Sequence, residues 1–177
     1  MNVPNSITVF RIFLIPVFIW QFLSGNLAIA AIIFFVAWVS DVLDGYIARK
    51  YNIVTDFGKF FDPLADKLIT LTALFLMAYN NYIHFILPII VLVKEVALAI
   101  GGAFLYKKLH KVEGAKWGGK IATFLFTVAI IFMLFDVTRE YGVIIMWIAL
   151  VVAFVALVEY VVGFMKIVKD KKGSSEE

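Results

Sequence analysis

Four aspartates in the first half of the chain have the residue type and the spacing of a site for divalent cations. They form two pairs, Asp41 with Asp44 and Asp62 with Asp66. The members of each pair are three or four positions apart, so in a helix each pair shares one face. Four carboxylates gathered at one place repel each other and cost free energy to bury, and a bound cation removes that cost.

The chemistry that such a site favours is displacement at phosphorus. Ligands that are all oxygen suit Mg²⁺, Mn²⁺ or Ca²⁺. Four carboxylates are enough to hold two such ions that bridge phosphate oxygens. Gly45 and Gly58 lack a Cβ, so a ligand or a neighbouring helix can approach the backbone there. Arg49 offers a forked donor to a phosphate.

The same residues also have ordinary structural interpretations. Asp62 could cap a helix that starts at Pro63. Asp66 could form an ion pair with Lys67 or Arg49. Gly45 and Ala48 could be helix-packing positions. The occurrence of all these residues together at this spacing favours the site.

The elements that must position the aspartates are apolar helices. Hydrophobic residues make up 63% of the 177-residue chain and charged residues 16%, against roughly 45–50% and about 25% in soluble domains. The mean hydropathy is +0.98, which excludes a disordered chain and a typical soluble enzyme. The chain has no cysteine, which excludes thiolate chemistry and disulfides.

We expect an all-α fold, a polytopic membrane protein of six transmembrane helices with an N-terminal interfacial helical start. A bilayer-spanning helix needs about 20 mostly apolar residues. The chain offers six such segments, at 7–24, 26–48, 63–80, 84–106, 117–136 and 140–165. The aspartate pairs end the second segment and begin the third, so an antiparallel hairpin would bring them together.

Lysine and arginine gather in alternate connections between the segments. They concentrate at 49–67, at 106–120 and after position 165. The positive-inside rule then places both termini, and the aspartate site with them, on the cytoplasmic side of the cell membrane. We expect one membrane domain over 1–168 and a charged cytoplasmic tail over 169–177.

The complete pattern D-x2-D-G-x2-A-R-x8-G-x3-D-x3-D resembles the signature of the CDP-alcohol phosphatidyltransferases. Its eight defined positions are filled by Asp41, Asp44, Gly45, Ala48, Arg49, Gly58, Asp62 and Asp66. The resemblance implies a membrane enzyme, usually dimeric, that moves a phosphatidyl group from CDP-diacylglycerol to an alcohol and releases CMP. The implied partners are these substrates, membrane lipids and a second copy of the chain, and not nucleic acid.

The resemblance also implies a role for each motif residue. Asp41, Asp44 and Asp62 would bind two Mg²⁺ ions, or Mn²⁺ in their place, with Asp62 bridging them. Asp66 would be the general base for the acceptor hydroxyl and would also touch the second metal. Residues expected along the nucleotide diphosphate are Gly45, Arg49 and Gly58.

A polar stripe marks the N-terminal segment, where Asn5, Thr8 and Arg11 recur every three residues. The pattern P-N-x2-T-x2-R is similar to the family's N-terminal element, which contributes to the nucleotide pocket. The resemblance therefore adds Asn5 and Thr8 to the nucleotide site. The alternative is an interfacial helix whose Arg11 snorkels to the membrane surface.

The acceptor side is less defined. The chain is most similar to the subgroup of the family that uses glycerol 3-phosphate, but Gly102 and Ala122 stand where that subgroup has cations. Lys94 and Lys120 remain as acceptor-binding candidates, and the structural alternative for Lys94 is an ion pair within the bundle. Two other functions stay open, a cardiolipin-synthase-type enzyme that uses phosphatidylglycerol and, more remotely, a cation transporter.

Overall fold

The computed structural model describes the backbone of residues 3–50, 56–109 and 117–173, and side chains mainly within 9–43, 64–102 and 117–163. The described backbone forms six α-helices and one short 3₁₀ helix, which confirms the expected all-helical architecture. The elements are α1 (Val3–Leu23), α2 (Leu27–Lys50), α3 (Asp56–Tyr79), α4 (Ile86–Leu109), α5 (Trp117–Met133), η1 (Asp136–Thr138) and α6 (Arg139–Gly173).

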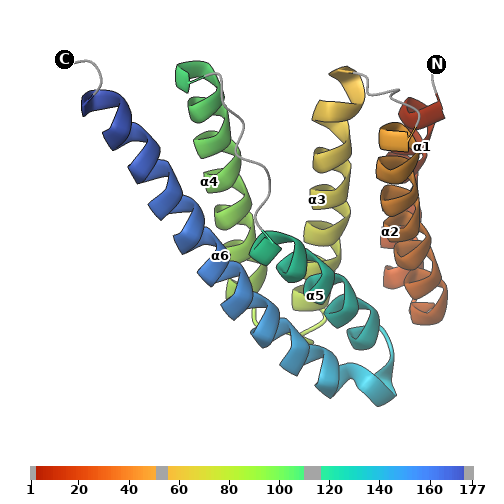
Figure 1. Ribbon diagram of the computed structural model, residues 1–177. Coiled ribbons are helices and arrows are strands. Elements are labelled where there is room, and N and C mark those ends of the chain that lie inside the picture. Colours follow the sequence, from red (N-terminus) through yellow and green to blue (C-terminus); the bar gives the residue numbers. More distant parts are fainter. Residues whose placement is uncertain (1–2, 51–55, 110–116, 174–177) are drawn as a thin grey trace.

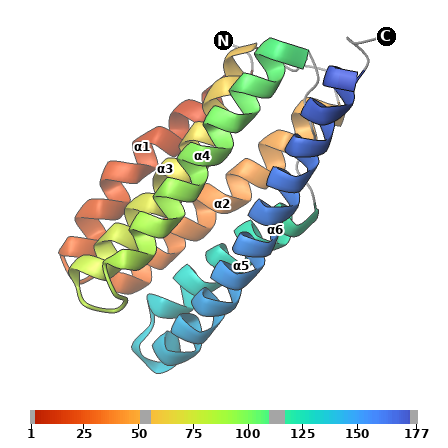
Figure 2. The ribbon, with the colours of Figure 1, turned by 90° about the vertical axis from the view of Figure 1, so that its left-hand side faces the viewer.

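The helices run alternately up and down (Figure 1). The start of α1, the end of α2, the start of α3 and the ends of α4 and α6 all lie at one end of the bundle. The turns after α1, α3 and α5 lie at the other end. Helix α3 is central, because it contacts α1, α2, α4 and α5. Helices α5 and α6 form a closely packed hairpin that a second view shows on the far side from α1 (Figure 2).

The core contains alanines, aliphatic side chains and four phenylalanine rings, while many large apolar side chains face outward. The Phe18 ring lies 6.0 Å from that of Phe22 and 5.8 Å from that of Phe34, which joins α1 to α2. On the outer surface, Trp20 is 65% exposed and Phe154 is 66% exposed. Soluble proteins rarely expose contiguous apolar surface on this scale, so this distribution favours an apolar solvent around the bundle.

Within the described residues, one helical segment is both long and apolar enough to cross a bilayer. It is Asp136–Gly163, with 28 residues, and its most apolar window of 18 residues has a mean hydropathy of 2.8. Three shorter apolar segments, Val9–Leu23, Leu27–Leu43 and Trp117–Met133, lie in α1, α2 and α5. Six helices are therefore confirmed, whereas the spanning of a bilayer by each of them stays a prediction.

Two helices, α3 and α6, extend furthest beyond the apolar segments that predicted them. Helix α3 begins at Asp56 instead of 63, so Asp62 lies inside the helix and does not cap it. Helix α6 continues to Gly173, into the predicted tail. The physical reason is that the length of an apolar segment reports only the part of a helix that suits the hydrocarbon core of a bilayer. The backbone groups of the residues beyond that part also need hydrogen bonds, and a helix that continues supplies them.

The α5–α6 hairpin depends on a close approach at Gly142. A Cβ added there would lie 2.6 Å from Met133 Cγ and 2.9 Å from the Ala129 carbonyl oxygen. At the same turn, Arg139 pairs with Asp136, and its guanidinium lies 3.8 Å from the centre of the Tyr82 ring. Arginine thereby ties this hairpin to the α3–α4 connection.

We expect Gly142→Ala to lower the free energy of unfolding by about 1–3 kcal/mol, the usual cost of overpacking. The added methyl would meet backbone atoms that cannot move aside. Thermal unfolding of the purified protein in detergent measures the effect. The matched control is Gly119→Ala, because a Cβ at Gly119 meets nothing within 4 Å. Equal stability of the two variants would contradict the close approach.

Candidate active site

A buried arginine joins α1 to α2. Arg11 is 1% exposed, and its guanidinium forms an ion pair with the Asp41 carboxylate. A charge taken out of water needs a partner of opposite sign, because its desolvation is otherwise uncompensated. The snorkelling interpretation of Arg11 is therefore wrong, since the side chain is enclosed by the bundle.

Asp66 of α3 lies beside this pair. Arg11 and Asp66 line one small cavity together with Trp38 and Thr127, so α1, α2, α3 and α5 all contribute to its wall. The Asp66 carboxylate is attracted by Lys67 and Arg11 and repelled by Asp41 and Glu95. The structure thus brings together one aspartate from each predicted pair, as expected of a hairpin between these helices.

The other two aspartates, Asp44 and Asp62, lie in the same helices, and their side chains are outside the described residues. Asp44 follows Asp41 by three positions in α2, and Asp62 precedes Asp66 by four positions in α3. Because α2 and α3 are antiparallel, both steps lead toward the same end of the bundle, by about 4.5 and 6 Å along the helix axes. All four backbone positions therefore lie on one stretch of the hairpin.

The donor set suits a hard divalent cation. The described side chains alone do not gather three metal-binding groups at one place, and two of the four expected ligands lie outside them. Asp41 can serve both Arg11 and a cation, because an ionised carboxylate has two oxygens and about four lone-pair sites. The ligands are all oxygen, which fits Mg²⁺ or Mn²⁺.

The five residues expected along the nucleotide all lie in helices, but their side chains are outside the described residues. They are Asn5 and Thr8 in α1, Gly45 and Arg49 in α2, and Gly58 in α3. Each lies between the aspartates or Arg11 and the end of the bundle that holds the start of α1 (Figure 1). Their assignment to the nucleotide stays a prediction.

A line of charged side chains leads from Asp66 toward α4. Lys67 Nζ lies 4.0 Å from Asp66 Oδ2 and 3.3 Å from Glu95 Oε1. The same Glu95 oxygen lies 2.6 Å from Lys94 Nζ. Lys94 therefore has the ion pair that its structural alternative required, and this pair lies within a network that reaches the expected base.

Lys120 lies apart from this network. It is exposed on α5, and its ammonium nitrogen lies 5.6 Å from the centre of the Trp117 ring. No described contact joins Lys120 to Lys94, so the structure does not bring the two acceptor-binding candidates together. Sequence reasoning missed Arg11 and Lys67 as site residues. The signal for both was a charged side chain inside an apolar helix, which marks a functional position by default.

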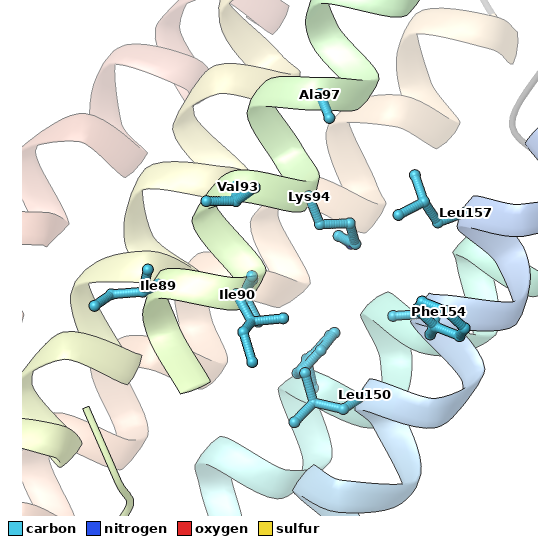
Figure 3. Close-up of a pocket in the computed structure, with 11 residues that line it drawn as sticks. Ile89, Ile90, Val93, Lys94, Ala97, Leu150, Phe154 and Leu157 are labelled. Carbon is cyan, nitrogen blue, oxygen red and sulfur yellow. The ribbon is translucent and has the colours of Figure 1, made fainter. Parts of the chain in front are cut away.

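An apolar groove of about 320 Å³ opens between α4 and α6 beside the network (Figure 3). Its walls include Ile90, Val93, Leu150, Phe154 and Leu157. Lys94 is one of the lining residues and extends from α4 toward α6 (Figure 3), and its ammonium contacts Glu95. The lining suits hydrocarbon, and it lies next to the charges around Asp66.

Comparison with known proteins agrees with the motif. Residues 1–155 match the family described as CDP-alcohol phosphatidyltransferase. A protein of Mycoplasma genitalium named CDP-diacylglycerol–glycerol-3-phosphate 3-phosphatidyltransferase is 35% identical over 154 residues, which cover 76% of this chain and 65% of that protein. Proteins of the same name are 36% identical in Bacillus subtilis, over 73% of this chain and 74% of that protein, and 42% identical in Rickettsia felis, over 53% and 54%.

The matched region contains α1 to α5 and all four aspartates. The aligned part spans about two thirds of the length of the Mycoplasma genitalium protein and about half that of the Rickettsia felis protein. A family of transferases favours the enzyme over the cation transporter among the functions that the sequence left open. The chain belongs to the CDP-alcohol phosphatidyltransferase family.

Proposed function

We propose that this chain transfers the phosphatidyl group of CDP-diacylglycerol to glycerol 3-phosphate and releases CMP. The observation that carries the proposal is that Arg11 pairs with Asp41 and lines one cavity with Asp66, within a complete family motif. The relatives in Mycoplasma genitalium and Bacillus subtilis, whose names state this donor and this acceptor, support the choice of substrates.

In this proposal Asp41, Asp44 and Asp62 hold two divalent ions, and Asp66 contributes to the second. Bound there, Mg²⁺ or Mn²⁺ would offset the negative charge of the diphosphate and of the leaving CMP. The nucleotide and its diphosphate lie along α1, α2 and α3. The residues assigned to them are Asn5, Thr8, Gly45, Arg49 and Gly58.

Asp66 acts on the acceptor. The acceptor hydroxyl oxygen attacks the phosphorus of the phosphatidyl group, and the bond between that phosphorus and the oxygen of the CMP phosphate breaks. The Asp66 carboxylate takes the hydroxyl proton as the new bond forms. The position of Asp66 supports this role, because its carboxylate lies at the end of the lysine network on one side and beside the Arg11–Asp41 pair on the other.

We further propose that six helices cross the cell membrane with both termini and the site on the cytoplasmic side, and that two copies form a dimer. The arrangement in Figure 1 supports the orientation, because the ends of α2, α4 and α6 lie together. The lysine-rich parts of the sequence fall at those ends or follow them directly. In the opposite turns, the sequence has one basic residue, Arg139, which pairs with Asp136.

A panel of acceptors tests the function. Purified protein, CDP-diacylglycerol and Mg²⁺ are incubated with glycerol 3-phosphate, phosphatidylglycerol, serine or inositol phosphate, and CMP and the lipid product are identified. We expect product with glycerol 3-phosphate only, its loss with excess chelator, and its return with Mg²⁺ or Mn²⁺. Product with phosphatidylglycerol alone would indicate a cardiolipin-synthase-type enzyme, and full turnover in chelator would reject the metal site.

Replacement of Asp66 separates a base from a metal ligand. Asp66→Asn should slow the chemical step by about 10²–10⁴-fold, the usual contribution of general acid–base catalysis. Donor binding should remain, because three carboxylates still hold metal. Single-turnover rates and donor binding are measured across a Mg²⁺ series, with Asp62→Asn as the ligand control that excess Mg²⁺ partly restores. Restoration of Asp66→Asn by Mg²⁺ would reject its role as the base.

Single cysteines in this cysteine-free chain test the orientation. Ser24→Cys, Asn80→Cys and Val137→Cys lie in the turns opposite the site, and all three positions are exposed. They should react with a membrane-impermeant maleimide in intact cells, whereas Ser174→Cys should react only after permeabilisation. The reverse pattern would place the site away from the cytoplasm.

A further inference from the structure

Glu95 lies between two lysines that come from different helices. Its Oε1 atom is 3.3 Å from Lys67 Nζ of α3 and 2.6 Å from Lys94 Nζ of α4. The side chains of Glu95 and Lys94 are 17% and 15% exposed, and that of Lys67 is 34% exposed. Two positive charges and one negative charge are thus held at one partly enclosed place.

This cluster borders the place where the proposed chemistry occurs. Lys67 Nζ lies 4.0 Å from Asp66 Oδ2. Lys67 and Glu95 also line a small cavity with Thr70 and Thr123, so α3, α4 and α5 enclose it. An anionic group that reached the two ammonium groups would lie within a short distance of the Asp66 carboxylate.

A single carboxylate oxygen sets the spacing of the two lysines. Two ammonium groups that contact the same oxygen atom repel each other. A lysine side chain also loses much rotamer freedom when it is held in one geometry. Because both ammonium groups contact the same Oε1 atom, Glu95 offsets the repulsion and fixes both positions. Without that carboxylate, the two lysines would separate.

We propose that Glu95 is a positioning residue that holds Lys67 and Lys94 as a paired cation site for the phosphate group of the acceptor. Lys67, rather than Lys120, is then the second cation of the site. The inference rests on the proposed function, in which the acceptor is glycerol 3-phosphate. With its phosphate on the two lysines, this small molecule directs its far hydroxyl toward Asp66.

Kinetics of two variants test the pair. Glu95→Gln and Lys67→Ala should each raise the KM for glycerol 3-phosphate about tenfold to a hundredfold, the effect of a lost charge-assisted contact. In both variants the KM for CDP-diacylglycerol should change by no more than about twofold. Glu95→Asp, which keeps the charge, should recover part of the loss. The matched control is Glu140→Gln, at an exposed position at the other end of the bundle.

A second measurement does not depend on turnover. Wild-type protein is acetylated with and without inorganic phosphate, and the reaction of each lysine is followed by peptide mass spectrometry. Phosphate should slow the acetylation of Lys67 and Lys94 relative to Lys171 and Lys172. This protection should weaken at least tenfold in Glu95→Gln. Size-exclusion chromatography and circular dichroism check that each variant is folded. If Glu95→Gln does not fold, the kinetics of Lys67→Ala test the lysine pair.

The outcomes separate this inference from the proposed function. An unchanged KM for glycerol 3-phosphate in both variants, with normal wild-type turnover, would overturn the lysine pair and leave the function intact. An equal rise in the KM of both substrates would overturn it as well. Phosphate protection of both lysines in a protein that does not use glycerol 3-phosphate would support the pair and reject the acceptor. Absence of protection in the wild-type protein would overturn the pair.

Discussion

The buried guanidinium of Arg11 is the constraint on which the site depends. A permanent charge inside a bundle of apolar helices must have a partner within reach, and Asp41 of α2 is that partner. The Arg11 guanidinium is buried and the Asp41 side chain is 35% exposed, and their ion pair links α1 to α2 at these positions. Helix α1 also packs against α3, and Asp66 therefore lies beside the pair.

Helix α3 divides the site into two parts because neighbouring residues of a helix point in different directions. Consecutive residues point about 100° apart around the axis. Asp66 accordingly faces the cavity shared with Arg11, whereas Lys67 faces Glu95 of α4. Thr70, one turn later, lines the cavities on both sides. Helix α3 thus lies between a carboxylate-rich part of the site and a lysine-rich part. The adjacent residues Asp66 and Lys67 connect the two parts.

The sequence could predict the helices and the hairpin, because apolar length and aspartate spacing are local properties. It could not predict the partners of Arg11 or Lys67. Those partners depend on how each helix is rotated about its axis, and α4, whose apolar residues surround the axis, has no marked polar face to indicate that rotation. The sequence also did not predict that α3 begins at Asp56 or that α6 ends at Gly173, because both helices continue past their apolar stretch.

The outward-facing apolar side chains, such as Trp20 and Phe154, determine how the protein meets its substrates. This surface favours an apolar solvent. In the proposed reaction, the lipid donor would then reach the protein by lateral diffusion in two dimensions, and the water-soluble acceptor would reach it from three. The rate then depends on the mole fraction of donor in the bilayer or micelle rather than on its concentration in the whole sample. Dilution with inert detergent at constant total donor would slow the enzyme, although no molecule has inhibited it.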